Sequence, residues 1–163
     1  KLLTTDKNII LYFAGHIEKQ YNIDYTHESD SSNERMKTLD GYISDDWFYR
    51  SFIQKINKNI KCRIYIDSCF SQGFSDFRYK YNSPNNVELN QLVEHVQSHI
   101  VSISSSSEYV KSLEINGQGV FTRDLIDSFE KLGNYNVIEL FDMFSKAHIM
   151  STFKFDREPI LLL

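Results

Sequence analysis

The chain has 163 residues, of which 41% are hydrophobic, and its net charge at pH 7 is −4. This length and hydrophobic content fit one domain with a buried core. The negative charge argues against binding to a nucleic-acid backbone, which requires a basic surface. No run of 18 apolar residues is present to span a membrane. We therefore expect neither nucleic acid nor a membrane as a partner.

The start of the chain and its cysteines suggest where the protein works. The chain begins at Lys1 and enters an apolar run almost at once, so we expect a processed or excised piece of a longer protein. Its two cysteines, Cys62 and Cys69, have the spacing of neither a zinc knuckle nor a redox CxxC pair. A disulfide framework is not expected from so few cysteines, and we predict a reducing, cytoplasmic location.

The first half of the chain predicts a strand, a long loop, a helix and a second strand. Residues 8–14, NIILYFA, form the near-continuous apolar run of a strand covered on both faces. Residues 17–43 are polar and acidic without a long periodic segment, which predicts a long loop. Ser44 is a candidate N-cap for a helix to about Asn57, and residues 62–67 form the second strand.

The second half predicts, in order, a loop, a short helix, a third strand, two helices and a last strand. Their ranges are 68–86, 87–96, 99–104, 118–131, 136–149 and 159–163. Gly133 would end the first of the two helices in the left-handed conformation. Asn136 and Glu139 would begin the second as a capping box. Strands that alternate with helices predict an α/β fold with a doubly wound sheet.

Reactive side chains follow two of the predicted strands: His16 comes after 8–14 and Cys69 after 62–67. Chemistry in open parallel sheets gathers beyond the carboxyl ends of the strands. A base after one strand and a thiol after another therefore predict a Cys–His nucleophilic site. Each residue also has a structural interpretation, since free cysteines are commonly buried and an isolated histidine commonly makes a structural hydrogen bond. Cys62, at the start of its strand, is the better structural cysteine.

The carboxylates have ordinary explanations as well. Asp45 and Asp46 would lie in the first turn of a helix, where acids complement the helix dipole. Asp30 and Asp76 fall in predicted loops, where solvated acids are common. On this pattern alone a metal site is the less favoured interpretation, and oxygen ligands would select Ca²⁺ over zinc.

Five segments together resemble the motifs of one protein family. They are YFAGH, ISDDW, DSCFSQG, GQGVFTRDLIDSF and REPIL. In this order they resemble the YSGHG, IxDDE, DSCHSG, GxxT and QxPxL motifs of the caspase-like cysteine peptidases (clan CD, family C14), and most closely those of the metacaspases. The resemblance implies a caspase-like three-layer sandwich with a mostly parallel sheet. It assigns residues 1–163 to one peptidase domain, with a large-subunit-like part (1–80), a linker (81–98) and a small-subunit-like part (99–163).

The resemblance also implies roles for single residues. Cys69 corresponds to the nucleophile and His16 to the general acid/base. The amides of Ile17 and Cys69 correspond to the oxyanion hole. Asp67 corresponds to the S1 acid that pairs with a basic P1 side chain, so the implied activity is cleavage of polypeptides after Arg or Lys.

The family's calcium site and its processing sites also have counterparts here. The acids of the calcium site correspond to Asp30, Asp45, Asp46 and Asp76, so Ca²⁺ is expected as an activator and no cofactor is needed for the chemistry itself. Two basic residues in the segment after the nucleophile, Arg78 and Lys80, are candidate self-cleavage points. We expect the protein to be a monomer.

Three departures from the family pattern bear on activity. Ile17 replaces the glycine after the histidine, and positive φ is disfavoured for a β-branched residue. Phe70 replaces the histidine after the nucleophile. The family's strands before 8–14 are missing from this chain, which would leave 8–14 as an exposed edge.

Two alternatives to a peptidase stay open. The first is a catalytically inactive caspase-like module that regulates or scaffolds another protein. The second is a flavodoxin-like or receiver-like domain of similar architecture, although no glycine-rich phosphate loop follows the first strand.

Overall fold

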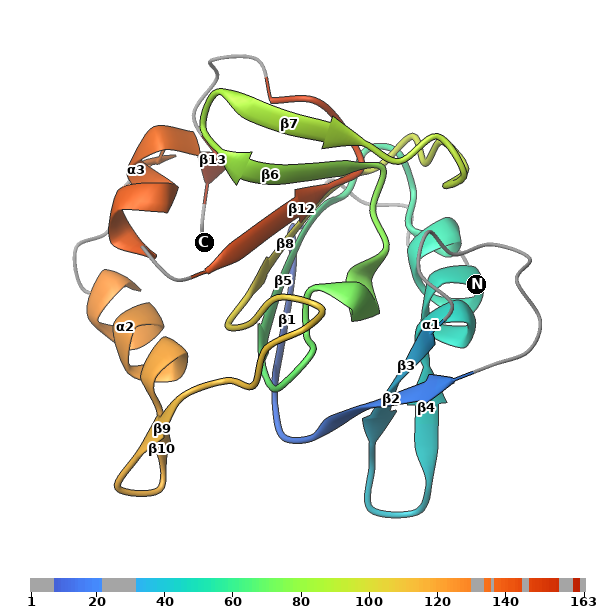
Figure 1. Ribbon diagram of the computed structural model, residues 1–163. Helices are drawn as coiled ribbons and strands as arrows, with labels where there is room; N and C mark the ends of the chain where they lie inside the picture. The colour runs from blue at the N-terminus through green and yellow to red at the C-terminus, as the bar shows by residue number, and fades with distance from the viewer. Residues whose placement is uncertain are drawn as a thin grey trace.

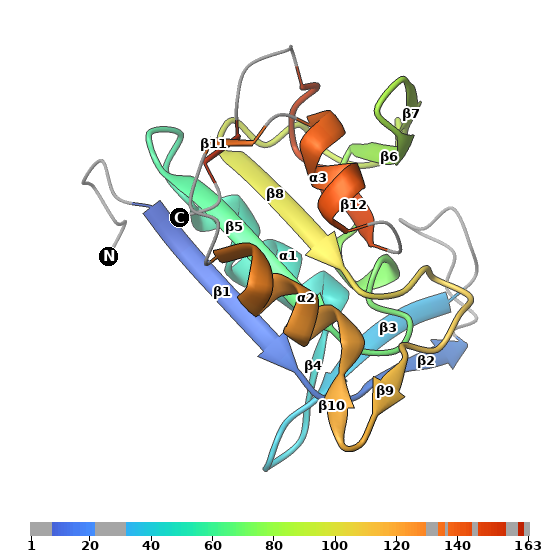
Figure 2. The same ribbon diagram turned by 90° about the vertical axis from the view of Figure 1, so that its left-hand side faces the viewer.

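The protein is described here from a computed structural model that covers residues 8–21, 32–129, 134–135, 137–144, 147–155 and 160–161. Its centre is a mixed six-stranded sheet with the strand order β1-β5-β8-β12-β6-β7 (Figures 1 and 2). The strands are β1 (Asn8–Ala14), β5 (Lys61–Asp67), β8 (His99–Ser104), β12 (His148–Ser151), β6 (Tyr79–Ser83) and β7 (Asn86–Leu89). The β1–β5 and β5–β8 pairs are parallel, and every pair from β8 to β7 is antiparallel.

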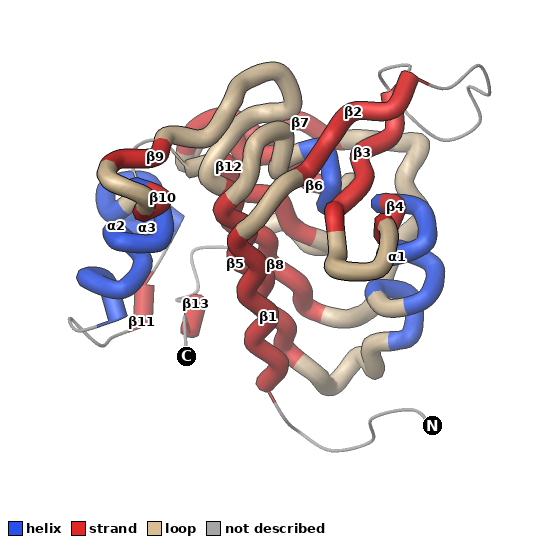
Figure 3. The backbone as a smooth tube through the Cα atoms, turned by 90° about the horizontal axis from the view of Figure 1, so that it is seen from below, coloured by secondary structure: helices blue, strands red, loops and turns tan. Residues whose placement is uncertain are grey.

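Other elements cover the two faces of this sheet, as Figure 3 shows from below. One side carries α1 (Asp45–Ser51), the 3-10 turns η1 (Ile53–Lys55) and η2 (Gly73–Ser75), and a small antiparallel sheet of β2 (Ile17–Tyr21), β3 (Ser32–Lys37) and β4 (Tyr42–Ser44). The other side carries α2 (Val120–Phe129) and α3 (Val137–Met143). Two short pairs complete the fold: β9 (Glu114–Ile115) with β10 (Gln118–Gly119), and β11 (Asn134–Tyr135) with β13 (Ile160–Leu161). The predicted α/β class is confirmed, but the expectation of a mostly parallel sheet is wrong, because two of the five described strand pairs of this sheet are parallel and three are antiparallel.

Strand β5, the second in the sheet, contributes to the core on both faces. Successive side chains of a strand point to opposite faces. Ile64 and Ile66 accordingly pack with Phe48 of α1 and Phe74 of η2. Tyr65, between them, packs on the other face with side chains of α2 and β12. Nearly every residue of β5 is buried, as its continuous apolar pattern predicts.

The structure corrects two predictions in the first half of the chain. β1 is not covered on both faces, because Ile10 and Tyr12 are 46% and 47% exposed. The predicted long loop at 17–43 is wrong where the structure describes it, since that region forms β2, β3 and β4. The sequence of this segment is mostly polar because only alternate side chains, such as those of Ile17 and Met36, are buried in the core. Charged side chains fill most of the positions between them.

The predicted helix after Ser44 is confirmed, although it is shorter than expected. The Ser44 hydroxyl accepts a hydrogen bond from the Trp47 amide (3.2 Å), which satisfies one of the free N–H groups at the helix start. α1 ends at Ser51, and the 3-10 turn η1 follows it in place of the last helical turns.

The second half of the chain contains two further corrections. The segments expected as a loop (68–86) and a helix (87–96) contain the hairpin β6–β7, which joins the main sheet, and 90–98 is irregular. The helix expected to reach Ile149 ends at Met143, and residues 148–151 form β12. The strand at 99–104 and the helix within 118–131 are confirmed. Gly133, Asn136 and most of 156–163 lie outside the described residues.

Candidate active site

The parallel pairing of β1 with β5 sets the positions of His16 and Cys69. The ladder pairs Ala14 with Asp67 at the carboxyl ends of the two strands. Beyond it, the Gly15 amide donates to the Asp67 carbonyl (3.2 Å), and the Ser68 hydroxyl donates to the Gly15 carbonyl (2.9 Å). The two segments that follow β1 and β5 therefore stay side by side up to the residues that precede His16 and Cys69. His16 is exposed and Cys69 is half-buried, so both are open to solvent.

Ile17 occupies a regular strand position and not a strained turn. Among the described non-glycine residues, positive φ occurs at Phe70, Asp76 and Asn116, and Ile17 is not one of them. Its side chain is 3% exposed and belongs to the core. The expected objection to a β-branched residue here therefore does not apply.

The register of β2 and β3 also determines where the Ile17 amide points. The Lys37 amide donates to the His16 carbonyl (2.9 Å), and Ile17 is paired with Met36. Hydrogen-bonded and non-hydrogen-bonded pairs alternate along an antiparallel ladder, so Ile17–Met36 is a non-hydrogen-bonded pair. The Ile17 N–H thus points away from β3, on the outer side of an edge strand.

Asp67, the predicted S1 acid, is 7% exposed and makes hydrogen bonds through both carboxylate oxygens. Oδ1 accepts from the Ser112 hydroxyl (3.0 Å), and Oδ2 accepts from the Thr122 amide (3.0 Å) and the Thr122 hydroxyl (2.5 Å). Gly119, which precedes α2, has no side chain to cap it. Asp67 supplies the cap from β5 instead, because Thr122 is the third helical residue, where a capping oxygen is received.

A serine-rich loop after β8 (residues 105–113) holds in place the loop that carries Cys69, the predicted nucleophile; this nucleophile loop comprises residues 68–78. Ser105 accepts from the Ser68 amide (3.0 Å), and Ser106 accepts from the Ser71 amide (3.2 Å). The Ser106 hydroxyl also donates to the Ser68 carbonyl (2.8 Å). The prediction from the sequence missed these residues and Thr122, although the run SSS at 105–107, directly after the predicted strand 99–104, was a usable signal.

Phe70, directly after Cys69, adopts a left-handed backbone conformation with φ of 55°. Its amide donates to the Val110 carbonyl of the serine-rich loop (3.3 Å). Further along, Gly73 packs so closely on the buried Glu34 carboxylate that a Cβ atom at Gly73 would lie 2.7 Å from Glu34 Cδ. Glu34 is also paired with Lys19 of β2 (3.3 Å). The nucleophile loop is thus attached to the β2–β3 sheet as well.

The two cysteines differ in environment. Cys62 is fully buried, and burial raises the pKa of its thiol to about 12. A thiol with such a pKa stays protonated at neutral pH and is a poor nucleophile. Cys69, beyond the end of the same strand, is half-buried.

Three of the four acids predicted to bind calcium line one pocket of about 500 Å³. Asp45, Asp46 and Asp76 share this pocket with Glu94. Burial and the nearby carboxylates of Glu94 and Asp76 raise the pKa of Tyr49 to about 12. Asp30 lies outside the described residues.

The carboxylate of Asp45 is already hydrogen-bonded to two backbone amides. It accepts from the Glu34 amide (2.6 Å) and the Asp46 amide (2.5 Å), and the residue is 2% exposed. In the part of the chain that the structure describes, no three His, Cys, Asp or Glu side chains gather closely enough to hold a metal ion. The described acids share a pocket wall but do not converge on one point.

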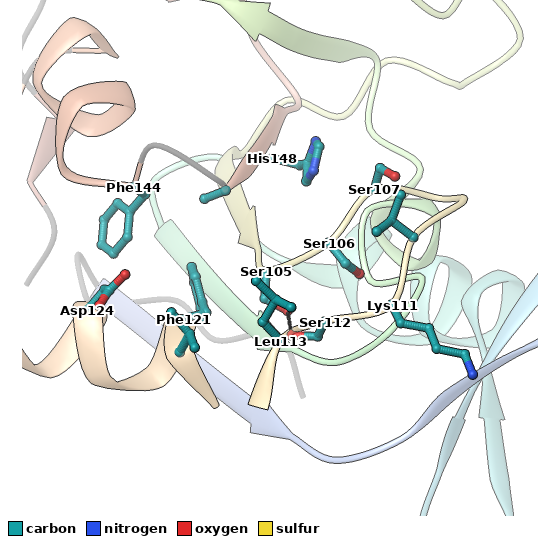
Figure 4. A pocket seen from close by; sticks show the side chains of 13 residues that line it. Ser105, Ser106, Ser107, Lys111, Ser112, Leu113, Phe121, Asp124, Phe144 and His148 are labelled. Carbon is teal, nitrogen blue, oxygen red and sulfur yellow. Dashed lines mark hydrogen bonds between the residues drawn. The ribbon is translucent and has the colours of Figure 1, made fainter. Parts of the chain in front are cut away.

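A second cavity of about 300 Å³ lies behind the serine-rich loop (Figure 4). Its apolar walls come from that loop, α2 and the segment before β12: Val110, Leu113, Val120, Phe121, Phe144 and Ala147. His148, which also lines it, starts β12 and does not lie on the helix predicted there. Burial and the nearby Lys80 lower the pKa of His148 below its ordinary value.

The candidate self-cleavage points belong to folded structure. Lys80 lies within β6, between β12 and β7, and forms an ion pair with Glu108 (3.0 Å). The carbonyl of Arg78 accepts a hydrogen bond from the Asn90 amide (2.8 Å). Cleavage after Lys80 would require β6 to leave the sheet, because a protease needs an extended, accessible segment.

No helix among the described residues is long and apolar enough to cross a membrane.

Comparison with known proteins agrees with this architecture. Residues 4–156 match the family described as "Caspase domain". The fold is similar to the crystal structure of protein GSU0716 from Geobacter sulfurreducens, with a TM-score of 0.65 and 16% sequence identity over 93% of this chain and 68% of that one. No curated protein is similar enough to count as a match.

Proposed function

The chain belongs to the caspase-domain family, and we propose that it is a cysteine endopeptidase whose catalytic dyad is His16 and Cys69. One observation carries the proposal. The β1–β5 register continues beyond the strands as hydrogen bonds from Gly15 to Asp67 and from Ser68 to Gly15, which hold together the residues that directly precede His16 and Cys69.

The chemistry follows from these positions. His16 accepts the proton of the Cys69 thiol, and the thiolate attacks the scissile carbonyl carbon. The negative charge that forms on the carbonyl oxygen is stabilised by the amides of Ile17 and Cys69. His16 then donates the proton to the leaving amine as the peptide bond breaks. Water, deprotonated by His16, attacks the thioester that remains, and the acid product and free Cys69 are released.

We propose a basic P1 residue, because Asp67 lies two residues before the nucleophile and its carboxylate is the charge that such a side chain would meet. A fluorogenic peptide assay of the full protein, with matched peptides ending in Arg, Lys or Asp, tests this. We expect cleavage after the basic residues and its loss in Cys69→Ala. Activity that survives Cys69→Ala, or cleavage only after Asp, would overturn the proposal.

Activation by Ca²⁺ is a separate proposal, which rests on the pocket that brings Asp45, Asp46 and Asp76 to one wall. Carboxylate oxygens are the ligands that Ca²⁺ prefers. Asp46 and Asp76 would provide its first contacts, since both oxygens of Asp45 are used by amides. Isothermal titration of Ca²⁺ into the wild type and into Asp45→Ala/Asp46→Ala tests it. Equal affinities would rule out this pocket.

The alternative, an inactive regulatory module, makes the opposite prediction for the intact protein. A peptidyl chloromethylketone with a basic P1 residue would then fail to modify Cys69, even though the fold is that of a peptidase.

A further inference from the structure

We propose that the Asp67 carboxylate can receive only one donor from a substrate, so that the site selects lysine over arginine at P1. This inference rests on the proposed function, in which Asp67 recognises a basic P1 side chain. The charge of Asp67 alone does not discriminate between lysine and arginine, since both side chains are cations.

The hydrogen bonds at Asp67 leave little acceptor capacity. An ionised carboxylate accepts but cannot donate, and it offers about four lone-pair sites. The Thr122 amide and hydroxyl both donate to Oδ2, and the Ser112 hydroxyl donates to Oδ1. Three of the four sites are therefore occupied within the protein, and the remaining one is on Oδ1.

One hydroxyl proton at this site can be assigned, because the Thr122 hydroxyl donates to Asp67 Oδ2. Thr122 must use its only hydroxyl proton toward Asp67, so the Tyr12 hydroxyl donates to Thr122 across their 2.7 Å contact. Tyr12 thus holds the Thr122 donor at Oδ2 in a fixed orientation. The Ser112 hydroxyl is within donating distance of both Asp67 Oδ1 (3.0 Å) and the Ser105 hydroxyl (2.8 Å), while Ser105 donates its own proton to the Ser68 carbonyl (3.2 Å).

The main chain of Gly119 closes the Oδ2 side of the carboxylate. A Cβ atom placed on Gly119 would lie 1.9 Å from Oδ2 and 3.1 Å from Oδ1. The backbone therefore covers one side of Oδ2, and the two Thr122 donors occupy the other. A donor from the substrate can reach Oδ1 alone.

This asymmetry discriminates between the two cations. The guanidinium of arginine is a planar fork that binds a carboxylate best with two parallel hydrogen bonds, one to each oxygen. Here the second oxygen is out of reach. The ammonium of lysine is a compact point charge that needs one carboxylate oxygen and can share its other donors with nearby hydroxyls. Ser112, which lies at Oδ1, is such a hydroxyl.

The direct test compares kcat/KM of the full protein for two fluorogenic peptides that differ only in Lys or Arg at P1. We expect the lysine peptide to be favoured by about tenfold, the effect of one lost hydrogen bond between charged groups. Equal values, or a preference for arginine, would overturn the inference and leave the proposed peptidase intact. Cleavage of neither peptide would overturn both.

Thr122 provides a matched pair of variants. Thr122→Ala removes the hydroxyl and opens space beside Oδ2, whereas Thr122→Ser keeps the hydroxyl and loses only the methyl group. We expect Thr122→Ala to bring the Lys/Arg ratio of kcat/KM close to one and Thr122→Ser to keep the wild-type ratio. A purely structural role for Thr122 would lower both rates together. An unchanged Lys/Arg ratio in a folded, active Thr122→Ala protein would overturn the role of Thr122 in the lysine preference. If that variant does not fold, the Lys/Arg ratio of the wild type alone tests the inference.

Discussion

The residues around Cys69 are joined by hydrogen bonds to β1, to the serine-rich loop and to α2, whereas the acids beside α1 line a common pocket without meeting. Both groups correspond to functional motifs of one family. The difference lies in what positions them. Parallel strands in register bring their carboxyl ends to one edge of the sheet, so the same ladder that builds the core holds the strand ends that lead to His16 and Cys69.

The acid pocket has no such ladder. Asp45 and Asp46 start α1, and Asp76 ends the turn η2 with φ of 36°. Each belongs to a separate local structure, and Asp45 is used to hold two backbone amides. The region around Cys69 is therefore fixed by the fold, while binding of a cation at the acids would have to draw side chains from two elements together.

The largest effect on stability is expected from a substitution where the start of α2 contacts Asp67 of β5. Gly119→Ala places a methyl group against Asp67 Oδ2, so the cap of α2 must move, and we expect unfolding free energy to fall by about 3 kcal/mol. Urea unfolding followed by circular dichroism measures it. Gly41→Ala is the control, because a Cβ there meets no atom within 4 Å. Equal midpoints for the two variants would show that the contact between α2 and Asp67 is not tight.

A smaller loss of stability is expected from substitution of Asp45, and a smaller one still from substitution of its neighbour Asp46. Asp45→Asn replaces one acceptor oxygen with an NH₂ group that faces a buried backbone amide, so we expect a loss of about 2 kcal/mol in stability. Asp46→Asn removes an exposed ion pair with Arg50, for which we expect less than about 1 kcal/mol. Thermal unfolding of the two variants side by side checks this. A costlier Asp46→Asn would mean that the roles of the two acids are reversed.

The smallest effect concerns pH and the cavity behind the serine-rich loop. His148 has a pKa lower than its ordinary 6.5 because of burial and the neighbouring Lys80, partly offset by Glu108. The unfolded chain therefore binds this proton more readily than the folded protein. The cost to stability is absent above about pH 7 and grows as the pH falls below 6.5. His148→Gln should flatten stability measured between pH 7 and 5 relative to the wild type, and an unchanged slope would contradict this.

Much of the fold could be predicted from local pattern. The apolar runs of β1, β5 and β8 identified the parallel half of the sheet, and Ser44 marked the start of α1. The antiparallel half could not be found in this way. β6 has one buried residue, Tyr81, and β7 has none, so neither shows an apolar run, and β12 is a short strand that was predicted as the end of a helix.

In the candidate site, too, the residues marked by a local pattern were predicted and the others were missed. His16, Cys69 and Asp67 were found because each follows or ends an apolar strand. Ser112 and Thr122 were missed, since their contacts with Asp67 join residues that are 45 and 55 positions apart and exist only after folding. The same contacts explain why the capping role of Asp67 was not foreseen.

The most direct test of the dyad is where a substrate-like reagent forms its covalent bond. The intact protein is treated with a peptidyl chloromethylketone that carries Lys at P1, digested, and analysed by mass spectrometry, with His16→Ala treated in parallel. The account predicts one adduct, on Cys69, that is lost or greatly slowed in His16→Ala, while buried Cys62 stays unmodified. An adduct on Cys62, or equal modification of Cys69 without His16, would contradict it.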